Sequence, residues 1–202
     1  MSWVVLNLKE MISNGVEETA KVYINNFSCS IEGDNGKTIS LNPGIEYFLK
    51  HNAIQFAKMK TSITFLVFDG IDEAFLGFFT LTHKPLDIPA DGLSRKIKDK
   101  IKRFSTLNER TNTYTVSAFL LAQFSKNYNI EQGKRISGSE LMEIAKEKLL
   151  SAQNIVGGTL LYLDCEPDAK LINFYENEGF VLFGERVSES DHKHYLQYLS
   201  FI

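Results

Sequence analysis

The strongest constraint on the fold is residues 113–124, TYTVSAFLLAQF, which carry apolar side chains at both odd and even positions. Successive side chains of a β-strand point to opposite faces, so a strand that is apolar on both faces is covered on both. A second stretch of this kind, GGTLLYLDCE at residues 157–166, follows a helical pattern at 139–152. The two stretches predict buried strands at the centre of a sheet that has helices packed against it.

The remaining elements alternate along the chain and are assigned by their hydrophobic spacing. The pattern predicts helices at 15–27, 43–56, 139–152 and 168–178, and strands at 62–68, 73–82, 180–185 and 194–202. Strands 62–68 and 73–82 form a hairpin around the turn DGIDE, and the stretch 84–112 breaks the pattern as an insertion. No internal repeat is found, so residues 1–202 are expected to form one α/β domain around a mixed sheet.

Composition excludes several classes of protein. Apolar residues make up 44% of the chain, and its net charge of −3 with a pI near 5.8 argues against nucleic acid or an anionic membrane as partner. No run approaches the roughly 18 apolar residues of a membrane helix, and Trp3–Leu6 is too short for a signal segment. Two cysteines indicate a reducing compartment, so a cytoplasmic protein is expected.

The segment FYENEGF, residues 174–180, allows two interpretations. In the first, Tyr175 fills the core, Gly179 ends the helix and Phe180 begins the next strand. In the second, Tyr175 gives a proton to a leaving thiolate, for which a phenol with a pKa near ~10 is suited. The neighbouring segments bear on this choice.

A buried strand, a loop that opens a helix, a second buried strand and a helix ending Tyr-x-x-x-Gly-Phe resemble the GNAT (Gcn5-related N-acetyltransferase) superfamily. The signature is intact at Tyr175, Gly179 and Phe180, and the order of elements fits over residues 10–202. The resemblance implies an α/β (α+β) fold: a mixed, mostly antiparallel central sheet with flanking helices and a splay between two central parallel strands. It also implies an acetyltransferase that moves acetyl from acetyl-CoA, as co-substrate and without a metal, to a primary amine by direct attack.

The resemblance further implies which residues bind the cofactor. Backbone groups at the end of strand 113–125 would bind the pantetheine arm, and backbone amides of the loop 129–140 would bind the pyrophosphate at a helix N-terminus. Ile136 and Gly133 stand where the family pattern has glycine and Gln or Arg, and the loop is about two residues longer. Asp168 occupies the place of a family asparagine. The implied set is Phe124, Ser125, Lys126, Lys134, Arg135, Ile136, Ser137, Gly138, Ser139 and Asp168.

The same loop has an interpretation that needs no ligand. Ser137 and Glu140 have the spacing of a capping box, in which each side chain bonds the backbone amide of the other residue. Glu140 would repel a phosphate unless its carboxylate turns back to this cap. Lys134 and Arg135 add positive charge next to it.

Catalytic roles follow from the resemblance and from position. Tyr175 would act as the general acid near the cofactor sulfur, and Glu166, at the end of its strand, is the best-placed general base. A solvated carboxylate is the alternative for Glu166. Cys165 precedes it on the strand, so its side chain faces the other way and is expected to be a buried thiol. His192 and His194 have no further ligand pattern around them, so no metal site is expected.

Other functions stay open. The acceptor pocket is expected from the N-terminal helices and the hairpin, and the acceptor is a small-molecule or protein amine. A catalytically silent CoA-binding module is the alternative, with the basic segment 93–104 as its partner surface. A solvated helix face over Ile97, Ile101 and Phe104 explains that segment equally. A toxin-like acetyltransferase acting on charged tRNA is disfavoured by the acidic pI, and a homodimer is left open.

Overall fold

The computed structural model describes residues 2–32, 38–189 and 192–202. It divides into two compact units. The first unit comprises residues 1–82 and 122–148, and the second comprises residues 83–121 and 149–202.

The first unit contains a sheet in the strand order β1 (Trp3–Asn7), β4 (Ile63–Asp69), β5 (Phe75–Pro89) and β7 (Thr113–Lys126), of which β5 and β7 continue into the second unit. β4 pairs with both β1 and β5 in the antiparallel sense, which confirms the predicted hairpin. β5 runs to Pro89, beyond the predicted end at residue 82. Its last residues alternate buried Leu86 and Ile88 with exposed positions, a period-two pattern that the proline-containing sequence hid.

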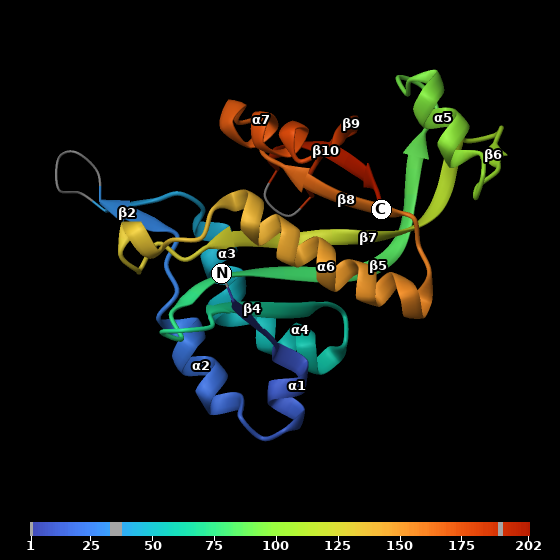
Figure 1. The fold of residues 1–202 in the computed structure, drawn as a ribbon. Coiled ribbons are helices and arrows are strands. Elements are labelled where there is room, and N and C mark those ends of the chain that lie inside the picture. The colour runs from blue at the N-terminus through green and yellow to red at the C-terminus, as the bar shows by residue number, and fades with distance from the viewer. Residues whose placement is uncertain (1, 33–37, 190–191) are drawn as a thin grey trace. The chain divides into compact units, whose positions relative to one another are not determined.

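Helices cover this sheet with a shared hydrophobic core, and Figure 1 shows α1, α2 and α4 together on one side of it. The helix predicted from Pro43 begins there, with Asn42 as its cap, but passes through a π-helical segment at Phe48–Asn52. The bounds are α1 Leu8–Ser13, α2 Glu17–Asn25, α3 Pro43–Tyr47 and α4 Ala53–Met59, and the small hairpin β2 (Ser30–Glu32) and β3 (Thr38–Ser40) lies outside the main sheet. The sequence did not predict β1, α1, β2 or β3, which are all short.

The second unit continues the strand order as β5, β7, β8 (Leu160–Cys165), β10 (His194–Phe201) and β9 (Val181–Val187). β10 runs antiparallel to both of its neighbours. The predicted insertion contains the end of β5, the helix α5 (Arg95–Ile101) and the short strand β6 (Leu107–Asn108), which pairs with β7. A separate hydrophobic core fills this unit and includes Ile97 and Ile101 of α5.

β7 and β8 pair in the parallel sense. The pairing joins Ala118–Leu120 to Leu160–Tyr162 and covers three residues of each strand, as a splay requires. β7 then continues into the first unit, while β8 stays in the second. The mixed, mostly antiparallel sheet with flanking helices confirms the predicted fold class.

Two more helices complete the chain. α6 (Gly138–Val156) begins in the first unit, ends in the second and exceeds the predicted range 139–152 by four residues at its C-terminal end. α7 (Ala169–Asn177) matches the predicted helix 168–178 within a residue at each end. None of the helices in the described part of the chain combines the length and apolarity needed to cross a membrane. The cytoplasmic location stays a prediction.

Candidate active site

The helix α7 is fixed at both ends by local interactions. Asp168 is its N-cap, since its carboxylate accepts hydrogen bonds from the amides of Lys170 (2.8 Å) and Leu171 (3.2 Å). After the helix, Gly179 adopts a φ of +86°, a left-handed conformation that favours glycine. The cap accounts for Asp168 without a ligand, so a pantetheine contact from this residue stays a prediction.

Tyr175 lies in the buried turn of α7, with 8% of its surface exposed. Its ring contacts the rings of Phe174, Phe180 and Tyr198 at centroid distances of 5.1, 5.7 and 6.5 Å. Burial raises the pKa of the Tyr175 phenol well above its usual value, and the nearby Cys165 thiol adds to the shift. The phenol therefore stays protonated through the physiological range, as a proton donor must.

The hydroxyl of Tyr175 differs from its ring. It makes no hydrogen bond to any residue within the described ranges. Packing explains the ring, and it leaves the hydroxyl without a structural role.

The two residues at the end of β8 have opposite environments, as the sequence predicted. Cys165 is a buried free thiol whose pKa burial raises to about 11, with the carboxylates of Asp164 and Asp168 adding to the shift. Glu166 is partly exposed and forms an ion pair with Lys193 at 2.6 Å. Lys193 occupies one oxygen of the carboxylate, and the role of Glu166 as general base stays a prediction.

The end of β7, where the pantetheine arm is expected, lies in the first unit against Gly77 of β5. A methyl group at Gly77 would come within 2.7 Å of the Ser125 carbonyl oxygen and 3.3 Å of Leu141 in α6. Ser125 itself donates a hydrogen bond to the Lys126 carbonyl at 3.1 Å, and its oxygen lies 3.4 Å from the Cys29 sulfur. The first unit thus brings together β5, the end of β7 and α6 through one glycine, which the sequence pattern did not single out.

Gly77→Ala is expected to weaken acetyl-CoA binding about tenfold or more and to lower stability, because the added methyl displaces the Ser125 backbone. Gly133→Ala is the control, since nothing lies within 4 Å of a methyl group there. Isothermal titration with acetyl-CoA and urea unfolding of both variants measure the two effects. Wild-type affinity in Gly77→Ala would show that the cofactor does not use the end of β7.

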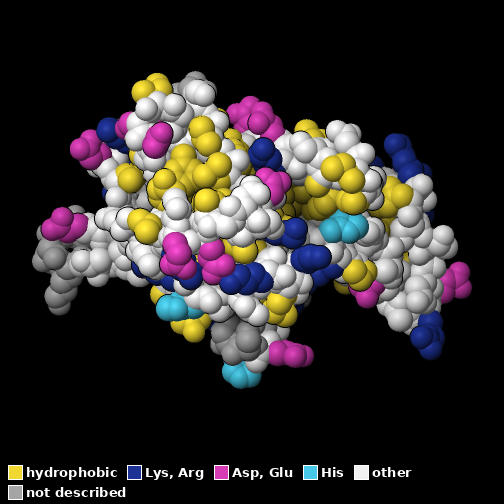
Figure 2. Space-filling view, turned by 90° about the horizontal axis from the view of Figure 1, so that it is seen from below, with side chains coloured by type: hydrophobic (Ala, Val, Ile, Leu, Met, Phe, Trp, Pro, Cys, Tyr) yellow, Lys and Arg dark blue, Asp and Glu magenta, His cyan; other side chains and the backbone are white. Residues whose placement is uncertain are grey.

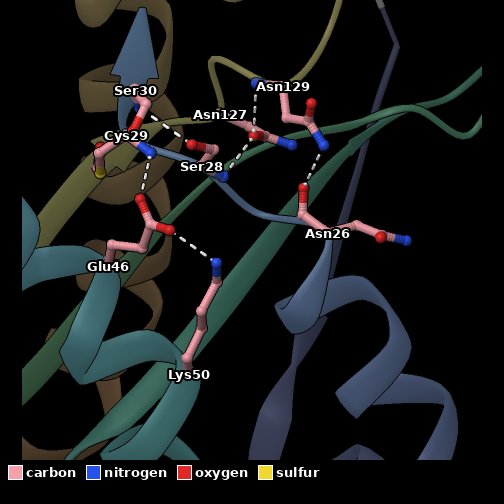
Figure 3. A network of polar contacts seen from close by, with 9 residues as sticks. Asn26, Ser28, Cys29, Ser30, Glu46, Lys50, Asn127 and Asn129 are labelled. Carbon is pink, nitrogen blue, oxygen red and sulfur yellow. Dashed lines mark hydrogen bonds and ion pairs between the residues drawn. The ribbon is translucent and has the colours of Figure 1, made fainter. Parts of the chain in front are cut away.

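Asn127, directly after β7, holds three chain segments together (Figure 3). Its side-chain oxygen accepts hydrogen bonds from the amides of Ser28 and Asn129, both at 3.0 Å, and its side-chain nitrogen donates to the Phe75 carbonyl at 2.8 Å. Its own amide donates to the Leu76 carbonyl at 2.7 Å. The residue is 2% exposed, and its buried side-chain amide has hydrogen-bond partners on both its oxygen and its nitrogen. A lone asparagine after an apolar strand was the one sequence signal for it.

A charged pair continues this network from the segment that Asn127 fixes (Figure 3). Glu46 accepts a hydrogen bond from the Cys29 amide at 2.9 Å and forms an ion pair with Lys50 at 2.7 Å. Burial alone would raise the pKa of Glu46, but the bonds from Lys50 and Cys29 hold it below its usual value. A hollow of about 300 Å³ opens beside the pair and is lined by Ser30, Ser40, Pro43, Glu46, Tyr47, Lys50 and His51.

The start of α6 confirms the predicted capping box. The Ser137 amide donates to Glu140 Oε2 at 2.9 Å, and the Glu140 amide donates to Ser137 Oγ at 3.1 Å. The Glu140 carboxylate is therefore turned back to the cap. The amides of Gly138 and Ser139 have no hydrogen-bond partner in the described part of the chain, so two donors remain at the helix N-terminus.

The two cations before this helix are engaged within the first unit. Lys134 forms an ion pair with Asp72 at 2.9 Å. Arg135 donates to the carbonyls of Tyr128 (2.9 Å) and Ile130 (3.2 Å) and lies over the Tyr128 ring. Ile136 is buried, so its side chain packs inward where the family pattern has glycine. These residues shape the loop, and their contact with phosphate stays a prediction.

Other candidate ligands do not converge. The Nε2 atom of His194 is hydrogen-bonded to the Glu185 carboxylate at 2.6 Å. Across residues 2–32, 38–189 and 192–202, no three His, Cys, Asp or Glu side chains are arranged to hold a metal ion.

The chain matches no family model and no curated protein sequence. Its structure is similar to a bacterial toxin (TM-score 0.63, 16% identity, 100% of this chain and 91% of that chain covered). It is also similar to a tyrosine-to-phenylalanine mutant of KacT (0.60, 14%, 97% and 94%). A third similar structure is AtaT complexed with acetyl-methionyl-tRNAfMet (0.59, 16%, 96% and 94%). Identities this low show a shared fold along nearly the whole chain.

Proposed function

The chain has the fold of the GNAT superfamily, and on this basis we propose that it transfers an acetyl group from acetyl-CoA to a primary amine. The observation that carries the proposal is the extent of the likeness, which reaches 96% of the chain or more for three acetyltransferase-fold structures. An insertion or a shared sheet alone would not give such coverage.

The first unit supplies the residues expected to hold acetyl-CoA, apart from Asp168. The unpartnered amides of Gly138 and Ser139 suit the pyrophosphate, because they lie at the positive end of the α6 dipole. The Glu140 carboxylate, bonded to the Ser137 amide, is held in the cap. The pantetheine arm, which is rich in amides, would pair with backbone groups of Phe124, Ser125 and Lys126.

The reaction needs one proton to leave and one to arrive. The amine nitrogen attacks the acetyl carbonyl carbon, and collapse of the resulting intermediate breaks the carbon–sulfur bond, with the electron pair leaving on sulfur. Tyr175 then protonates the thiolate, since its hydroxyl is protonated and has no partner in the described part of the protein. The attacking amine loses its proton to Glu166, if Lys193 releases the carboxylate, or to water.

For the acceptor we favour the α-amine of an amino acid carried on tRNA. The support is the likeness to AtaT, whose structure was determined with acetyl-methionyl-tRNAfMet. The acidic pI argued against nucleic acid, but net charge is a property of the whole chain and does not exclude a local basic surface. The hollow beside Glu46 and Lys50 lies in the N-terminal region where the sequence predicted the acceptor pocket.

Acetyl-CoA is expected to raise the melting temperature more than pantetheine does, because binding to the native state alone stabilises it. Gly138→Pro should lower the acetyl-CoA shift and leave the pantetheine shift unchanged. The change removes one unpartnered amide at the first helical position, where proline is tolerated. Thermal denaturation of both proteins with each ligand measures this, and Gly133→Ala is the control. If the two ligands raise the melting temperature of the wild type equally, the N-terminus of α6 does not bind the pyrophosphate.

The catalytically silent CoA-binding module is separated from the enzyme by turnover. A free-thiol assay with aminoacyl-tRNA and with simple amines should show thiol release that depends on the acceptor. Binding of acetyl-CoA with no thiol release on any acceptor would favour the module.

A further inference from the structure

The helix α5 and the two residues after it carry a concentration of positive charge, which we name the α5 surface: Arg95, Lys96, Lys98, Lys100, Lys102 and Arg103. Asp99 is the one acidic residue in this stretch, so residues 95–103 carry a formal charge of +5. Because the whole chain carries −3, the remaining residues together carry −8. The chain as a whole is acidic, and this short segment is a local concentration of positive charge.

The second unit fixes the direction of these side chains. Ile97 and Ile101, one helical turn apart, are buried in the core of the unit, so the cations occupy the other faces of the helix. A hollow of about 530 Å³ lies along them, lined by Arg95, Lys96, Asp99, Lys100 and Arg103. The predicted helix face over Ile97 and Ile101 is confirmed, whereas Phe104 lies beyond the helix and is 40% exposed.

Most cations of the α5 surface are not neutralised by carboxylates. Arg95 approaches Asp99 at 3.8 Å with both side chains largely exposed, and Lys100 lies over the Phe201 ring. The other four make no ion pair with a residue of the described ranges: Lys96, Lys98, Lys102 and Arg103. Outside α5, six cations lie beside carboxylates, namely Lys21, Lys50, Lys58, Lys134, Arg186 and Lys193. Other cations there, such as Lys9 and Lys60, form no ion pair with a described residue but are not clustered in the sequence as those of α5 are. Figure 2 shows basic and acidic side chains interspersed on one face of the molecule.

We propose that the α5 surface binds the phosphate backbone of a nucleic acid. That this binding serves acetyl transfer to an amino acid carried on tRNA rests on the proposed function. Lys96 and Lys100 share one face of α5, and Arg103 follows in the turn after the helix and lines the same hollow, so the three cations extend over about 10 Å at roughly 1.5 Å per residue. Phosphates recur about every 3.4 Å along the axis of one strand, so this stripe spans about three of them. The negative charge of the remaining chain repels the same polyanion, which orients the encounter toward α5.

An anionic membrane is the less suitable partner for the same charges. A helix that lies on a membrane inserts an apolar face, and the apolar residues of α5 are already buried in the core of the unit. Binding to phosphate groups through exposed Lys and Arg side chains needs no such face.

The test compares two triple variants that each remove three positive charges. Lys96→Gln, Lys100→Gln and Arg103→Gln change the α5 surface, and Lys60→Gln, Lys84→Gln and Lys148→Gln change lysines of similar exposure elsewhere. Binding of labelled, unacylated tRNA is measured by fluorescence anisotropy at several salt concentrations. The α5 triple variant should bind about tenfold or more weakly and reduce the slope of log K against log salt by about 2, since each lost phosphate contact removes roughly 0.7 to 0.9.

The control triple variant should keep the wild-type affinity and slope. An equal loss of tRNA affinity in the control, or no tRNA binding by the wild type at low salt, would overturn the proposal that the α5 surface binds nucleic acid. The proposal would also be overturned if the α5 triple variant lost binding to phosphatidylserine vesicles while its tRNA binding stayed unchanged. Thiol release with a simple amine acceptor tests acetyl transfer separately, because the α5 residues are not part of the proposed catalytic site.

Discussion

Tyr175→Phe is expected to lower kcat by on the order of a hundredfold or more, the usual contribution of a positioned proton donor. The free energy of unfolding should change by less than about 0.5 kcal/mol, because the ring contacts remain and the hydroxyl has no partner among the described residues to strand. Affinity for acetyl-CoA should stay close to wild type, since the hydroxyl acts after attack. Steady-state kinetics and urea unfolding on the same protein measure the effects.

Tyr198→Phe is the matched control. Tyr198 lies next to Tyr175, is also buried, and directs its hydroxyl toward Glu176 at 3.5 Å. Loss of the Tyr198 hydroxyl should leave kcat within about twofold of the wild-type value, because this hydroxyl has no part in the proposed reaction. Full activity in Tyr175→Phe would mean that the residue serves packing alone, and the acid role would be withdrawn.

The pH profile gives a second test of Tyr175. A donor works only while protonated, so ionisation of the phenol produces a decline in kcat on the alkaline side. Burial raises the pKa of Tyr175, which moves this decline above the usual tyrosine range, to beyond pH ~10. A wild-type decline that begins well below the usual tyrosine range would have to come from another group, and it should persist in Tyr175→Phe.

Asn127→Ala is expected to lower the free energy of unfolding by about 3 kcal/mol or more. The change leaves the part-buried amides of Ser28 and Asn129 and the buried carbonyl of Phe75 without their partner, and a stranded buried group costs about 1–3 kcal/mol. A loss of this size is a large fraction of the roughly 5–15 kcal/mol typical of a domain. Urea unfolding measures it.

Two further variants make the Asn127 result specific. Asn129→Ala removes one hydrogen bond, to the Asn26 carbonyl, at an exposed site and should cost about 1 kcal/mol or less. Asn127→Asp keeps the acceptor for both amides but replaces the donor to Phe75 with a carboxyl oxygen at a buried site, so its cost should rise with pH as the carboxyl ionises. A cost below about 1 kcal/mol in Asn127→Ala would show that water replaces the side chain, and that this residue does not fix the segment before β2.

Local patterns determined much of this fold. The strands at 113–124 and 157–166, the hairpin after residue 62 and the helix beginning at Pro43 follow from spacing that a single element contains. The Ser137–Glu140 cap and the left-handed Gly179 after α7 also depend on neighbours within four residues. Interactions over such short separations are set by backbone geometry, so the sequence is enough to predict them.

Contacts between distant residues were decided by the tertiary structure. Asn127 bonds residues 99 and 52 positions away, and Gly77 is required where β5 meets the Ser125 carbonyl. Lys134 is neutralised by Asp72, whereas Lys96 and Lys102 of the α5 surface have no such partner in the described chain. Charge and polarity in a sequence do not say which groups will meet, because that depends on the packing of elements far apart in the chain. The sequence therefore determined the longer elements and the Tyr-x-x-x-Gly-Phe signature, and folding decided which polar groups were left without a partner.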